Sequence, residues 1–198
     1  RLKQTLPRTL TSQQTLSLLK EIPDLNATAW VGARDCALFT LIYGTGLRIA
    51  EALSLRRGDW TAQEMITITG KGRKQRVVPL LPIIHEAMAA YLKVCPHVLT
   101  AESPLFVGVS GKPLHAGVAQ RALRVYAQAL GLPEKTTPHA LRHACATHLM
   151  VNSHDLRGIQ ELLGHAQLSS TQIYTHLDHQ SLLDTFGTFH PRMSKEEK

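Results

Sequence analysis

The chain contains few cysteines, the residues that form disulfides in secreted proteins and that bind structural zinc. Its three cysteines, Cys36, Cys95 and Cys145, are widely spaced among 198 residues, and no CxxC pair is present. An odd number without such a pair argues against a disulfide framework and against a structural zinc site. We therefore expect a reducing compartment, the cytoplasm. Cys36 and Cys145 fall in helical apolar patterns and are predicted to lie in the core.

A long apolar run is also missing. No stretch approaches the ~18 residues that a membrane span requires, and the first four residues, RLKQ, do not resemble a signal peptide. No membrane partner is expected. Acidic residues are outnumbered, 15 against 22 basic ones, so the formal charge is +7 and the pI is about 9.6. Such an excess favours a polyanionic partner, although charge alone does not identify nucleic acid.

The pattern of apolar residues predicts one mainly helical α+β domain with a small antiparallel sheet. Residues 65–69 and 75–80 alternate as strands around a glycine-flanked basic turn, which is typical of a β-hairpin. Residues 105–109 are a candidate third strand of that sheet. Gly44 is the expected end of the second helix. Helices are predicted at about 12–21, 30–43, 48–55, 83–94, 116–130, 138–151, 155–163, 169–176 and 179–189.

The segment 137–143 (TPHALRH) combines a helix start with basic side chains. Its threonine is a good N-cap and its proline a good first helical residue. His139, Arg142 and His143 follow at i, i+3 and i+4, near the free N–H groups of the helix start, which suits a phosphate. The alternative is a solvated basic face. A zinc motif of the HExxH type is excluded because Ala140 stands where glutamate is needed.

Two further basic clusters lie upstream. In 44–51 (GTGLRIAE), Arg48 begins a helix and Glu51 follows one turn later, where its carboxylate can orient the guanidinium. The turn 70–74 (GKGRK) is not a P-loop, which needs GxxxxGK[ST]. Taken alone, the first cluster is also explained as a surface ion pair, and the second as an ordinary charged turn.

Two single residues complete the set. His165 follows Gly164, the expected stop of a helix, and Tyr174 lies on the helix that 169–172 opens with a capping-box pattern. In isolation such a histidine is usually a capping residue, and such a tyrosine usually belongs to a core or an interface.

Together these elements resemble the catalytic domain of tyrosine recombinases, from about residue 11 to residue 192. The segments 160–165 (QELLGH) and 171–178 (TQIYTHLD) are specific for the bacterial Xer group, and 190–192 (HPR) favours its XerC branch over XerD. Six residues match the family's catalytic positions: Arg48, Lys71, His139, Arg142, His165 and Tyr174.

The resemblance implies a role for each of them. Tyr174 would attack the scissile phosphate and form a 3′-phosphotyrosyl link, and Lys71 would protonate the leaving 5′-oxygen. His139 would assist proton transfer at the tyrosine, and His165 would bond the phosphate. The two arginines would hold the non-bridging oxygens. No metal and no cofactor is implied.

Supporting and DNA-binding residues are expected around this set. Glu51 and His143 are assigned supporting roles, while Arg73, Lys74 and Arg76 of the basic turn and the strand after it are expected to bind DNA.

The resemblance also predicts domains and partners. Residues 1–10 are expected to be a linker from a missing N-terminal DNA-clamping domain, 11–190 the catalytic domain and 191–198 a tail. The implied partner is double-stranded DNA, either a dif-like site or a Holliday junction, bound by a tetramer that is homomeric or shared with a XerD-like protein. A DNA translocase is a candidate regulator. The implied role is resolution of chromosome dimers, linked to cell division; the alternatives are a phage- or transposon-type integrase, a type IB topoisomerase-like activity and, less favoured, a non-catalytic DNA-binding regulator.

Overall fold

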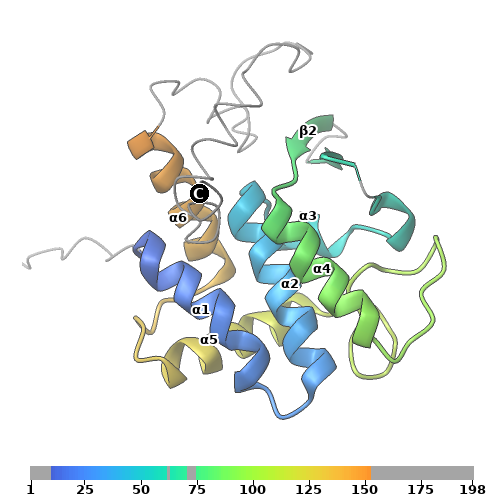
Figure 1. Ribbon diagram of the computed structural model, residues 1–198, viewed down its shortest axis with the longest axis horizontal. Coiled ribbons are helices and arrows are strands. Elements are labelled where there is room, and N and C mark those ends of the chain that lie inside the picture. Colours follow the sequence, from blue (N-terminus) through green and yellow to red (C-terminus); the bar gives the residue numbers. More distant parts are fainter. Residues whose placement is uncertain (1–9, 62, 71–74, 153–198) are drawn as a thin grey trace, which may run out of the picture.

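The computed structural model describes residues 10–61, 63–70 and 75–152. These residues form a mainly helical structure with one two-stranded antiparallel sheet (Figure 1), so the predicted fold class is confirmed. The predicted helices at 155–163, 169–176 and 179–189 lie outside the described residues. The elements are α1 (Ser12–Leu25), α2 (Ala29–Thr45), α3 (Ile49–Leu53), the 3₁₀ turn η1 (Arg57–Asp59), β1 (Met65–Thr69), β2 (Gln75–Pro79), α4 (Pro82–Val94), α5 (Ala116–Ala129) and α6 (Pro138–Asn152).

Helix α2 is the centre of the core. It runs between α4 on one side and α1 and α6 on the other (Figure 1), and nearly every side chain of its second half is buried. This explains its sequence, because a helix covered on several sides is apolar around its whole circumference rather than along one stripe. Its C-terminal end leads into α3, and Arg142 of α6 donates a hydrogen bond to the carbonyl of Gly46 directly after it.

Local capping explains where two helices begin. The Thr11 hydroxyl accepts a hydrogen bond from the Gln14 amide at 3.1 Å, and the Gln14 side chain accepts one from the Thr11 amide at 3.0 Å. At α6 the Thr137 hydroxyl accepts from the Ala140 amide at 3.2 Å. Both caps were predicted, and both are confirmed.

The predicted end of α2 was wrong by two residues. The helix continues through Gly44 to Thr45, and Gly46 ends it in the left-handed conformation, with φ 64° and its N–H bonded to the Ile42 carbonyl at 2.9 Å. Gly44 serves helix packing instead. A Cβ there would lie 2.8 Å from Cδ1 of Ile84, so the missing side chain lets α4 approach α2 closely.

The sheet consists of β1 and β2 in the part of the chain that the structure describes, paired from Met65 with Pro79 to Thr69 with Gln75. Residues 105–109 do not extend it, contrary to the prediction. Their backbone bonds to loops instead: the Leu105 amide donates to the Leu55 carbonyl at 2.8 Å. Residues 105–107 are fully buried, so their apolar run reflects a buried connection rather than a strand.

A buried polar network ties α1, α2 and α5 together. Asp35 accepts hydrogen bonds from Arg34 at 2.7 and 2.9 Å and from the Tyr126 hydroxyl at 2.8 Å. That hydroxyl in turn accepts from the Asn26 amide at 2.7 Å. Arg34 and Asp35 are 2% and 0% exposed, so the pair is stable only because each polar atom has a partner.

Two smaller findings complete the fold. Cys145 is fully buried and Cys36 is half-buried against the core, which confirms the prediction for both. Among the described residues, no helix is both long and apolar enough to cross a membrane.

Candidate active site around Glu51

The turn after α2 sets the position of Arg48. Gly46 ends the helix, Leu47 is fully buried and fixes the chain, and Arg48 in extended conformation becomes the N-cap of α3. Oε2 of Glu51, one turn on, accepts the Arg48 amide at 2.8 Å, and Oε1 accepts its guanidinium at 3.1 Å. The predicted i, i+3 pair is therefore confirmed. The Arg48 side chain remains 47% exposed, so it can also reach a ligand.

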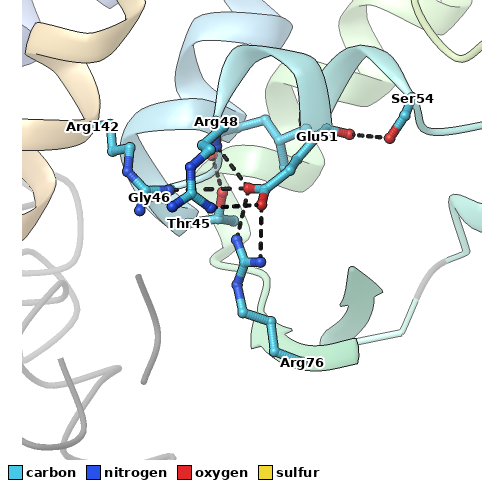
Figure 2. Close-up of polar contacts among 8 residues, drawn as sticks. Thr45, Gly46, Arg48, Glu51, Ser54, Arg76 and Arg142 are labelled. Carbon is cyan, nitrogen blue, oxygen red and sulfur yellow. Dashed lines mark hydrogen bonds and ion pairs between the residues drawn. The ribbon is translucent and has the colours of Figure 1, made fainter. Parts of the chain in front are cut away.

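Arg76 of β2 reaches the same carboxylate. Its two terminal nitrogens donate to Oε1 and Oε2 of Glu51 at 3.2 and 2.8 Å, in the two-pronged geometry that suits a guanidinium (Figure 2). The side chain is only 12% exposed. It was predicted to bind DNA, but the structure places it on an internal carboxylate. Strand alternation was the available signal, because Arg76 shares a face with the fully buried Val78.

Arg142 arrives from α6, far away in the sequence. It is 8% exposed and donates a hydrogen bond to the carbonyl oxygen of Gly46, and its guanidinium lies 4.0 Å from Oε2 of Glu51. Burial lowers the pKa of Arg142, as does the nearby Arg48, while Glu51 opposes both effects. The packing of α6 on α2 thus brings the two predicted phosphate-binding arginines to the same turn (Figure 2).

Two of the histidines of α6, His139 and His143, were predicted to take part in the site. His139 and His143 are exposed, and Nδ1 of His143 lies 3.0 Å from the Thr147 hydroxyl one turn on. The structure thus brings Arg48, Glu51 and Arg142 together but does not place these histidines in the same hydrogen-bonded cluster. The remaining predicted site residues lie outside the described part of the chain: Lys71, Arg73, Lys74, His165 and Tyr174.

The charge of this cluster favours an anion. Burial alone would raise the pKa of Glu51, but the hydrogen bonds from Arg76 and Arg48 outweigh it and lower that pKa from 4.5 to about 2. Glu51 is therefore ionised at neutral pH, and three guanidiniums around one carboxylate leave a formal charge of +2. Such a partly desolvated excess of arginine charge suits a phosphate. Among the described residues, no three histidine, cysteine or acidic side chains are grouped closely enough to hold a metal ion.

Comparison with known proteins identifies the family. The profile of the phage integrase family matches residues 8–181. The chain belongs to that family. Within it, the chain is 49% identical over 191 residues to the tyrosine recombinase XerC of Brucella suis biovar 1 (strain 1330), which covers 95% of the chain and 60% of that protein. It is 50% identical over 192 residues to the XerC of Rhodospirillum centenum (strain ATCC 51521 / SW), with 96% and 56% covered.

Solved structures of this family agree with the fold. The XerH recombinase bound to its difH substrate in a pre-cleavage complex has a TM-score of 0.70 at 34% identity, over 86% of this chain and 51% of that one. The XerA recombinase has a TM-score of 0.72 at 28% identity, over 97% and 66%. The predicted resemblance and the predicted tyrosine recombinase catalytic fold are confirmed. The chain spans 60% and 56% of the length of the two relatives described above.

Proposed function

We propose that the protein is a site-specific recombinase that cleaves and rejoins DNA strands through a 3′-phosphotyrosyl intermediate. The observation that carries this proposal is the cluster in which Arg48 and Arg142 converge beside Glu51 with an excess of positive charge. In the five-coordinate transition state, the phosphodiester gains negative charge on its non-bridging oxygens. Arginines already held in place stabilise that charge without having to reorganise.

The tyrosines of the chain support Tyr174 as the nucleophile. The chain has four tyrosines, and the other three, Tyr43, Tyr91 and Tyr126, are at most 7% exposed. Each of these hydroxyls is engaged in a hydrogen bond, and burial raises the pKa of each phenol above its ordinary value. A buried phenol of raised pKa is a poor nucleophile for a DNA phosphate. Tyr174 is the remaining candidate.

In the proposed reaction the phenolic oxygen of Tyr174 forms a bond to phosphorus while the bond from phosphorus to the 5′-oxygen breaks. His139 assists removal of the phenol proton, whose ordinary pKa is about 10, and Lys71 supplies a proton to the leaving oxygen. His165 bonds the phosphate, and His143 supports the site. In the second step a 5′-hydroxyl attacks the phosphotyrosyl link and restores the backbone. Bond energy is kept in the link, so no nucleotide cofactor is needed.

We also propose the DNA site, the biological role and the partners of the protein. Relatives named XerC, and a XerH structure that holds its difH substrate, support a dif-like site as the substrate and resolution of chromosome dimers in the cytoplasm as the role. We further propose that the protein works as a tetramer on DNA, homomeric or shared with a XerD-like partner, with a DNA translocase as regulator. Arg73 and Lys74 are proposed to contact the DNA backbone.

Trapping on a nicked suicide substrate tests the chemistry. Loss of the short fragment beyond the nick prevents religation, so a covalent protein–DNA adduct accumulates and survives denaturation. Tyr174→Phe should abolish the adduct while DNA binding persists. The matched control is Tyr91→Phe, which removes the hydroxyl bonded to the Leu105 carbonyl at 3.2 Å and should still form adduct. A normal adduct yield from Tyr174→Phe would refute the assignment.

A further inference from the structure

Arg76 is placed where a DNA contact would be unfavourable. Its side chain is 12% exposed, and both terminal nitrogens point at the Glu51 carboxylate. To bind a phosphate, Arg76 would have to break its hydrogen bonds to the Glu51 carboxylate, which is 8% exposed. That carboxylate would then keep only its contacts with Arg48 and Arg142. Separating a largely buried ion pair is costly, because it leaves a buried charge without its partner. A surface phosphate contact does not offset that cost, because it is screened by water and salt.

Each carboxylate oxygen of Glu51 accepts hydrogen bonds from both Arg48 and Arg76. Oε1 accepts from the guanidiniums of Arg48 and Arg76, and Oε2 accepts from the Arg48 amide and from Arg76. Figure 2 shows Arg76 approaching the carboxylate from the hairpin, with Arg48 and Arg142 on the other side. Arg76 therefore holds the carboxylate in one orientation and satisfies part of its charge.

The presence of Arg76 changes the net positive charge that the cluster can offer to a phosphate. With Arg76 in place, the cluster carries a formal charge of +2; with a neutral side chain there, it carries +1. Without Arg76, the negative charge of Glu51 would be balanced mainly by Arg48 and Arg142, the two cations that the proposed mechanism uses. Arg76 thus keeps those cations available to the phosphate.

Arg76 also connects the hairpin to the site. It lies opposite Ile68 in the sheet, and its bond to Glu51 fastens β2 to the start of α3. The segment 71–74, which contains Lys71, joins β1 to β2. The ion pair between Arg76 and Glu51 therefore holds the start of β2 close to the turn that carries Arg48.

We propose that Arg76 is a positioning residue that acts through Glu51 on Arg48 and Arg142, and that it does not contact DNA. This inference rests on the proposed function, because it assigns Arg76 a part in the same phosphate chemistry.

The test measures binding and cleavage separately in the full-length protein. Arg76→Gln should leave the DNA dissociation constant within about twofold and the salt dependence of binding unchanged, because no phosphate contact is lost. Single-turnover cleavage of the nicked substrate should fall about 10- to 100-fold. A salt slope reduced by about one would instead identify a phosphate contact and overturn the inference.

A neutral substrate separates positioning from general damage. When a methyl group replaces one non-bridging oxygen of the scissile phosphate, less negative charge has to be stabilised, so the cleavage defect of Arg76→Gln should shrink. An equal defect on both substrates would mean that the variant only disturbs the fold, which contradicts the proposal. Glu51→Gln combined with Arg76→Gln should cleave no more slowly than the slower single variant, because both act through one contact. Independent, multiplying effects would also contradict it.

Two controls keep the outcomes distinct. Arg56→Gln removes a 58% exposed arginine paired with the exposed Glu102 and should leave cleavage unchanged. Arg76→Lys keeps the charge without the two-pronged geometry and should restore part of the rate. If the unmodified protein forms no adduct, the proposed function itself fails. If it forms adduct and Arg76→Gln cleaves equally fast, only this inference fails.

Discussion

Replacing Glu51 by glutamine should destabilise the protein in a way that depends on pH. Glutamine has nearly the same shape, and its amide oxygen can still accept the Arg48 amide. It cannot balance the charge of Arg48, Arg76 and Arg142, which lie 2.8 to 4.0 Å from the Glu51 carboxylate oxygens. The variant therefore removes a negative charge that lies against three positive ones in a largely buried cluster.

The size of the effect follows from the pKa. Burial opposes ionisation of Glu51, but the bonds from Arg76 and Arg48 bring its pKa from 4.5 down to about 2 on folding. A carboxyl with such a lowered pKa stabilises the fold by about 3 kcal/mol at pH 7. Because the folded pKa lies below the unfolded one, this contribution is complete above about pH 5 and falls to about 1 kcal/mol at pH 3.

Urea unfolding at a series of pH values measures this contribution directly. The difference in unfolding free energy between the natural protein and Glu51→Gln should be about 3 kcal/mol at pH 7 and should narrow steadily below pH 4.5. Glu102→Gln is the matched control: that carboxylate is 81% exposed in a surface pair with Arg56, so its loss should have little effect. A difference below about 1 kcal/mol at pH 7, or one that does not change with pH, would refute the reasoning.

Three further changes test other parts of the structure. Arg142→Ala should lower the rate of covalent adduct formation by ~10²-fold or more in single-turnover assays, and a near-normal rate would reduce Arg142 to a phosphate anchor. Tyr126→Phe removes the donor to Asp35 at 2.8 Å and should cost about 1 to 3 kcal/mol in urea unfolding; no loss would mean that water replaces the hydroxyl. Gly44→Ala places a Cβ 2.8 Å from Ile84 and should cost a similar amount, about 1 to 3 kcal/mol, with Gly131→Ala, where nothing lies within 4 Å, showing only the cost of its left-handed backbone.

Features that depend on neighbouring residues were predictable from the sequence. The caps at Thr11 and Thr137 and the Arg48–Glu51 pair each involve residues no more than three apart, so the pattern itself contains both partners. The hairpin was predictable for the same reason, since strand alternation and a glycine-flanked turn are local signals.

The errors occurred where distant segments decide the structure. Gly44 looks like a helix end, yet α2 continues through it because Ile84 of α4 occupies the space that a side chain would need. Residues 105–109 look like a strand, yet their backbone partners are loops, among them the one at Leu55. In both cases the local pattern suggested one structure, a helix end or a strand. The glycine and the apolar residues are instead explained by packing against distant segments.

The sequence alone was enough to predict the family, because the types and order of its arginines, lysine, histidines and tyrosine resemble those of tyrosine recombinases, and the match to the phage integrase profile confirms that the chain belongs to the family. Which charged side chains meet depends on how distant segments pack together. Arg76 looked like one more cation of a basic turn, and the fold turns it inward onto Glu51. The strength of an ion pair depends on distance and on exclusion of water, and both are set by how helices and strands pack together, not by the order of residues in the chain.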